Sequence, residues 1–176
     1  WPIEQYVRDA KIDTLYEGTT AIQGLDFFFR KIVKDGGRAL GLLGKEIQAF
    51  AESGGAHAAE KQALVKALGD LNGIVAVLVG HAMDSQTDAV KIYKVGLNTS
   101  RCLMAVGDII TSWLLLRQAD IAVEKLPNAG KDTDFYTGKI AAAKFFVHNN
   151  LPHITADRKI VEATDGSIME LPESAF

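Results

Sequence analysis

The chain has 176 residues, of which 48% are apolar and 23% are charged, and its formal net charge at pH 7 is −3. These values are typical of a globular protein with a buried core, and they exclude an intrinsically disordered chain. Because no block of Lys and Arg stands out in this slightly acidic sequence, a nucleic-acid partner is not expected.

Helical periodicity runs through most of the sequence, since apolar residues recur at spacings of three and four. Alternating runs of β-branched and aromatic residues are missing, so we predict an all-α fold. The predicted helices cover approximately residues 18–35, 38–52, 56–83, 87–126, 134–149 and 154–163. Short loops between helices favour antiparallel neighbours, which predicts an up-and-down helical bundle.

Glycine and proline mark the predicted ends of these helices. Gly36-Gly37 ends the first helix and 53–55 ends the second, because glycine readily takes the left-handed conformation that follows a helix. The Gly96–Asn98 segment is expected to kink or split the fourth helix. Pro152, after two asparagines, is expected to end the fifth.

Neither apolar stretch of the chain is expected to span a membrane. A spanning helix needs about 20 apolar residues; the stretch 71–83 is shorter, and Asp108 interrupts the stretch 102–116. The start of the chain lacks the pattern of a signal peptide, and the single cysteine, Cys102, is compatible with a reducing compartment. We therefore expect a cytoplasmic protein, and because the chain begins with Trp1 we expect it to be part of a longer one.

The segment before the first predicted helix carries groups that could do chemistry. Glu17 lies on a loop immediately before the helix, and Gly18 would allow a ligand to approach the backbone closely. Thr19 and Thr20 add hydroxyls at a helix N-terminus, where free N–H groups can bind phosphate. The alternative is an ordinary helix start, with Glu17 in a solvated first turn where the helix dipole favours a negative charge.

The residues from Arg8 to Gln23 resemble the signature of the acyl-CoA dehydrogenases. The resemblance rests on Arg-Asp-Ala-Lys-Ile at 8–12, Leu-Tyr-Glu-Gly-Thr at 15–19 and Ile-Gln at 22–23. It implies FAD-dependent α,β-dehydrogenation of an acyl-CoA thioester to the trans-2-enoyl-CoA. Glu17 would be the catalytic base that removes the α-proton, and its backbone N–H would bind the thioester carbonyl oxygen together with a flavin hydroxyl.

The same resemblance implies further site residues. Gly18 would lie against the substrate, and Thr19, Thr20 and Ala21 would contact FAD. Since Ala21 lacks the polar side chain common at its position, its contact would be through the backbone.

Two other positions depart from the signature. Gly24 stands where the family often has Arg. Phe29 stands where an Arg on the CoA side is usual, with Arg30 beside it. The departure at Phe29 leaves Arg30 without an assigned CoA contact.

The remainder of the chain resembles the extra helical domain of long bacterial acyl-CoA dehydrogenases. The similarity includes Lys139–Phe146 and Met169–Pro172, close to the final Phe176. It implies that residues 1–35 end the catalytic helical bundle and that 36–176 form the extra domain. The chain alone would then be inactive, while the intact enzyme would be a homo-oligomer of fatty-acid β-oxidation that passes electrons to electron-transfer flavoprotein or a similar acceptor.

Two other functions remain open. One is a non-catalytic helical module for oligomerisation or docking, and the other is an acyl-CoA oxidase-like enzyme with the same base. No metal site is expected, because the four histidines are scattered and do not form the Glu-x-x-His pairs of a di-iron bundle. Cys102 is expected to be a small buried residue, and Phe27–Phe29 are expected to lie in the core or a subunit contact.

Overall fold

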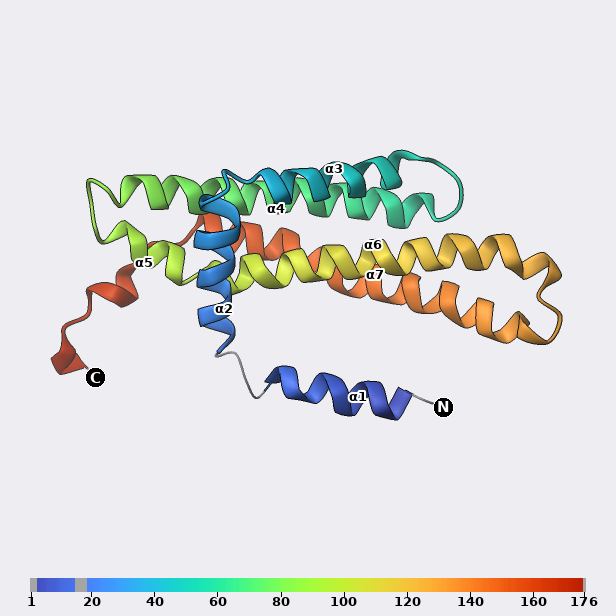
Figure 1. Cartoon of the computed structure of the whole chain (residues 1–176). Helices are drawn as coiled ribbons and strands as arrows, with labels where there is room; N and C mark the ends of the chain where they lie inside the picture. Colours follow the sequence, from blue (N-terminus) through green and yellow to red (C-terminus); the bar gives the residue numbers. More distant parts are fainter. Residues whose placement is uncertain (1–2, 15–18, 176) are drawn as a thin grey trace.

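The computed structural model of the chain describes residues 3–14 and 19–175. All regular structure in these residues is helical, which confirms the all-α prediction. Figure 1 labels the α-helices, which are α1 (Ile3–Lys11), α2 (Thr20–Asp26), α3 (Arg38–Glu52), α4 (Ala58–Asp84), α5 (Lys91–Gly96), α6 (Thr99–Lys125) and α7 (Thr133–Glu162). A π-helical segment, η2 (Phe27–Val33), follows α2. Short 3-10 turns are Ile12–Thr14, Leu126–Asn128, Gly130–Asp132, Ser167–Glu170 and Glu173–Ala175.

The bundle consists of the long helices α3, α4, α6 and α7, which run up and down with short connections (Figure 1). Helix α4 packs against each of the other three, and α6 and α7 form an extensive antiparallel pair. Helix α2 runs across the bundle rather than along it, and it packs on α6. Helix α1 buries none of its residues.

The core is one continuous apolar cluster. It is built from inward-facing residues of α3, α4, α6 and α7, among them Ile47, Leu64, Ile109 and Val147. Phe28 and Ile32 of η2 belong to the same cluster. The predicted domain boundary between residues 35 and 36 stays a prediction.

The glycine breaks lie where the sequence predicts them. Gly36 and Gly37 have φ angles of 66° and 74°, a conformation that side chains disfavour, and α3 begins at the next residue. The carboxylate of Asp35 accepts hydrogen bonds from the N–H groups of Gly37 and Ala39, at 2.8 and 3.0 Å. This side chain therefore caps the start of α3.

The structure confirms one predicted break and differs from the prediction at two other places. The fourth predicted helix is split into α5 and α6 at 97–98, as the Gly96–Asn98 segment allowed, whereas α1 was not predicted at all. Helix α7 continues through Pro152, where the sequence predicted an end. An internal proline costs a helix about 3 kcal/mol. The helix continues because Leu151 and Ile154, on either side of the proline, are buried in the core.

Two helical stretches are long and apolar enough to cross a membrane by length and composition, namely α4 and residues 91–128. The length argument for the stretch 71–83 was therefore wrong, and Asp108 does not prevent the second stretch from meeting the same criterion. Both stretches are central elements of the bundle, and residues such as Leu64, Ile74 and Leu116 are fully buried inside it. The expected absence of a membrane span stays a prediction.

Candidate functional site

The predicted catalytic segment leads directly into α2. Glu17 and Gly18 lie outside the described residues. Thr19 is the N-cap of α2, with an extended backbone, and its Oγ1 accepts a hydrogen bond from the N–H of Ile22 at 3.4 Å. The predicted helix start near residue 18 is confirmed to within two residues, since α2 begins at Thr20.

The first turn of α2 faces away from the rest of the described residues. The side chains of Thr19, Thr20 and Ala21 are all exposed. Two hydroxyls beside the N-terminal amides of a helix form a donor set that suits phosphate and hydroxyl-rich groups. This surface could hold part of a dinucleotide cofactor, while the FAD contacts themselves stay predictions.

Helix α2 and segment η2 form one continuous helix that is anchored at its second half. The N–H of Lys34 donates to the carbonyl of Phe29 at 3.1 Å, a bond five residues back that is typical of a π-helix. Phe28 is 0% exposed and Ile32 is 3% exposed. The rings of Phe28 and Phe29 pack edge to face, with centroids 5.1 Å apart. Phe28 is therefore a core residue as predicted, whereas Phe27 and Phe29 are partly buried against that core.

Gly24 is buried where α2 crosses the start of α6. A Cβ atom at this position would lie 2.9 Å from the amide nitrogen of Ser100 and 2.9 Å from the carbonyl carbon of Thr99. Real Cβ contacts are not this short, so no side chain fits unless one backbone moves. The departure from the signature at Gly24 thus has a physical reason, because an Arg here would collide with α6.

The start of α6 is held by a buried amide that sequence reasoning did not single out. Asn98 is 2% exposed, and its Nδ2 donates to the carbonyl oxygen of Lys94 at 3.0 Å and to Oγ1 of Thr164 at 2.9 Å. The Thr164 hydroxyl in turn donates to the carbonyl of Ile160 at 3.0 Å. Asn98 therefore ties the end of α5 and the end of α7 to the first turn of α6.

Arg30, the residue beside the expected CoA-side position, lies on the surface. Its side chain is 68% exposed, and its Nη1 lies 2.8 Å from Oδ1 of Asp26, one turn earlier. An exposed pair of this kind contributes about 0.3–0.5 kcal/mol. The guanidinium remains open to solvent, and the described residues add no contact from which a CoA site could be argued.

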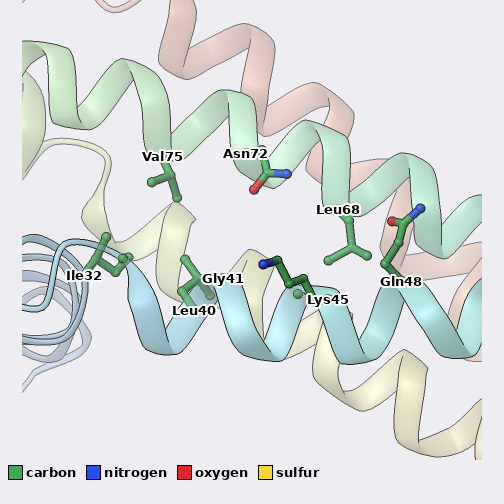
Figure 2. A pocket seen from close by; sticks show the side chains of 10 residues that line it. Ile32, Leu40, Gly41, Lys45, Gln48, Leu68, Asn72 and Val75 are labelled. Atoms are coloured by element: carbon green, nitrogen blue, oxygen red, sulfur yellow. The ribbon is translucent and has the colours of Figure 1, made fainter.

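A groove of about 340 Å³ lies between α3 and α4. Figure 2 shows Lys45 and Gln48 on α3 and Asn72 on α4 at this groove, with Leu68 and Val75 among its apolar lining. Lys45 is the only titratable side chain among the residues that line it. The polar side chains of Gln48 and Asn72 beside it are amides, which do not titrate, so the groove offers no pair of acid–base groups.

The charged groups between the helices are engaged in structural pairs. Lys61, 4% exposed, lies 2.8 Å from the carboxylate of Asp120, and its Nζ donates to the Gly54 carbonyl at 2.7 Å. The carboxylate of Glu60 and Nε2 of His148 are 2.9 Å apart. Within residues 3–14 and 19–175, no group of three or more His, Cys, Asp or Glu residues could hold a metal ion.

Cys102 is a buried residue of α6, as the sequence predicted. It is fully enclosed, and burial raises the pKa of its thiol to about 12. Since the thiolate is the reactive form of cysteine, burial disfavours a nucleophilic role for Cys102 at neutral pH.

Known proteins resemble this chain over nearly its whole length. The sequence model of the family described as "Acetyl-CoA dehydrogenase C-terminal like" matches residues 43–172. The broad-specificity linear acyl-CoA dehydrogenase FadE5 of Mycobacterium tuberculosis is 52% identical over 100% of the chain. A butyryl-CoA dehydrogenase of Syntrophomonas wolfei is 32% identical over 96% of it, and the 3-methylmercaptopropionyl-CoA dehydrogenase of Ruegeria pomeroyi is 30% identical over 95%. The chain spans 30%, 28% and 28% of the lengths of these three relatives.

Proposed function

The chain belongs to the acetyl-CoA dehydrogenase C-terminal-like family, and we propose that it is part of an FAD-dependent acyl-CoA dehydrogenase in which Glu17 is the catalytic base. The reaction would convert an acyl-CoA thioester to the trans-2-enoyl-CoA. The observation that carries the proposal is the 52% identity to an acyl-CoA dehydrogenase across the entire chain, the signature segment included.

The chemistry assigned to the chain's own residues is proton removal and polarisation of the thioester. Glu17 removes the α-proton, and its backbone N–H donates a hydrogen bond to the thioester carbonyl oxygen, where negative charge develops. When bound, FAD would supply the acceptor for the hydride that leaves the β-carbon. Gly18 lets the substrate approach the backbone, because a side chain there would occupy the same space. Thr19, Thr20 and the backbone of Ala21 would hold FAD, and their exposure in and beside the first turn of α2 supports this role.

The proposal also covers the electron acceptor, the oligomeric state and the location of the enzyme. The relatives are named as dehydrogenases, which favours electron transfer to electron-transfer flavoprotein or a similar acceptor over direct reaction with oxygen. We also propose a homo-oligomeric, cytoplasmic enzyme of fatty-acid oxidation without a membrane span. Large exposed apolar side chains on the bundle, such as Met104, Phe135 and Phe145, support contacts with further protein.

Substitution of Glu17 by Gln in the full-length protein tests the assignment of the base. We expect bound flavin to be retained and turnover of acyl-CoA to fall by about 10²–10⁴-fold, the usual contribution of a positioned general base. Glu46→Gln, a matched change on the exposed surface of α3, should leave turnover unchanged. Normal turnover of the Glu17→Gln protein would exclude this residue as the base.

The two alternative functions give different results with the unaltered full-length protein. A docking or oligomerisation module would contain no flavin and would show no absorption in the visible range. An oxidase-like enzyme would consume oxygen with acyl-CoA and no added acceptor. We expect a flavin spectrum and turnover that depends on an added electron acceptor, and the 176-residue chain alone should be inactive.

A further inference from the structure

Helix α2 touches the bundle through backbone rather than through side chains at its midpoint. Figure 1 shows α2 crossing the bundle where α6 begins. At the crossing, Gly24 lies directly against the peptide that joins Thr99 and Ser100. A contact between two backbones has little freedom to adjust, because neither surface can change its rotamer.

Further contacts hold both α2 and the start of α6 in place. One turn and two turns after Gly24, Phe28 and Ile32 insert into the core of the bundle, with 0% and 3% of their surfaces exposed. On the other side, the two hydrogen bonds of buried Asn98 fix the start of α6 to α5 and α7. The position of α2 is therefore set both by the segment that follows it directly and by residues near Asn98 that come much later in the sequence.

We infer that the start of α6, formed by Asn98, Thr99 and Ser100, is a seat that positions α2 and thereby the neighbouring Glu17, with Gly24 as the positioning residue. The inference rests on the proposed role of Glu17 as the base. It gives the helical bundle that follows Gly37 a function in catalysis, namely to hold the helix from which the catalytic segment leaves.

The connection from the seat to the base is short. Thr19 caps α2 and lies one turn before Gly24 on the same helix, and Glu17 precedes Thr19 by two residues. A methyl group at Gly24 would have to move from 2.9 Å to the 3.4 Å at which ordinary contact begins, a displacement of about 0.5 Å. Since a 1 Å misplacement of reacting groups can cost about 10²-fold in rate, roughly tenfold is expected here.

The test is Gly24→Ala in the full-length protein, with Gly107→Ala as its matched control. Gly107 is on α6 as well, but a Cβ there would meet nothing within 4 Å. We expect Gly24→Ala to lower kcat about tenfold, to change KM less than about threefold and to leave the flavin content unchanged. The acidic limb of the pH profile of kcat should also move, because the base is in altered surroundings. The control should match the unaltered protein in all four measurements.

A second variant keeps the inference testable if Gly24→Ala does not fold. Asn98→Asp preserves the size of the side chain but removes the amide that donates to Lys94 and Thr164. We expect the same pattern, with kcat lowered and KM and flavin content maintained. Asn149→Asp is the control, since this exposed amide donates only within its own helix, to Phe145.

The outcomes separate this inference from the proposed function. If Glu17→Gln abolishes turnover while the folded Gly24→Ala and Asn98→Asp proteins keep the kcat and pH profile of the unaltered protein, the seat has no positioning role and the inference is overturned. A loss of flavin and folding in both variants, without a folded form of lower kcat, would equally reduce the seat to a structural contact. Full turnover of Glu17→Gln would instead refute the proposed base.

Discussion

Replacement of Lys61 by Met should destabilise the bundle far more than its single charge suggests. The ammonium of Lys61 lies 2.8 Å from Asp120 on α6 and donates to the Gly54 carbonyl before α4. It also lies 4.7 Å from the centroid of the Phe50 ring on α3. One side chain thus joins three helices, and it does so with only 4% of its surface exposed.

The expected size of the effect follows from what the substitution leaves behind. Loss of one partner from a buried ion pair costs about 3–5 kcal/mol, because the other charge remains buried and uncompensated. Oδ1 of Asp120 already has no hydrogen-bond partner in the described part of the chain. The carboxylate is still 24% exposed and can gain water, so we expect a loss near the lower limit, about 3 kcal/mol.

Urea unfolding, followed by the fluorescence of buried Trp113, measures this difference as a change in the free energy of unfolding. Lys66→Met is the control, since Lys66 is 62% exposed and its pair with Asp70 should contribute at most about 1 kcal/mol. Replacement of both Lys61 and Asp120 by Met and Leu should recover most of the stability, because no buried charge remains unpaired. The reasoning is refuted if Lys61→Met and Lys66→Met lose equal stability.

Three further predictions concern single residues of the core and of the α4–α7 interface. Phe28→Ala should lower the free energy of unfolding by about 3–5 kcal/mol, because it leaves a cavity where a ring was fully buried; a loss below about 1 kcal/mol in urea unfolding would contradict this packing. Cys102 should not react with a thiol reagent at pH 8 until the protein unfolds, since burial raises its pKa to about 12, and rapid labelling of the native protein would disprove its burial. Although burial acts to raise the pKa of Asp70, hydrogen bonds from Lys66 and Thr155 hold it below its ordinary value. Its stabilising effect should therefore be complete above that ordinary value and be lost as the pH falls through the lower, folded value. An Asp70→Asn protein with an unchanged acid-unfolding curve would contradict this.

Features set by neighbouring residues could be predicted from the sequence. Helix α3 begins and ends at the predicted residues, 38 and 52, because glycine pairs at both ends stop the flanking helices. The split before α6 and the burial of Cys102 also followed from local pattern. The end predicted at Pro152 was wrong, since burial of residues on both sides of the proline outweighs the local cost of an internal proline.

Features set by contacts between distant segments could not be predicted in this way. Asn98 looked like a helix break, and its second role became visible only when Thr164, 66 residues later, was placed beside it. The base itself, Glu17, came from a resemblance to a signature and not from any spacing rule, and its position in the fold stays a prediction.

Gly24 shows how the two kinds of information combine. In the sequence it is only a departure from a signature that often has Arg, and a missing cation would ordinarily weaken the assignment of a site. The structure shows instead that the backbone of α6 occupies the space that an Arg side chain would need. The glycine at position 24 is therefore required by the close packing of α2 on α6. In a protein that has this glycine and the same helical bundle, the position of α2 should therefore be determined by its contact with α6. Restoring Arg at position 24 should accordingly displace α2 and lower turnover below that of Gly24→Ala.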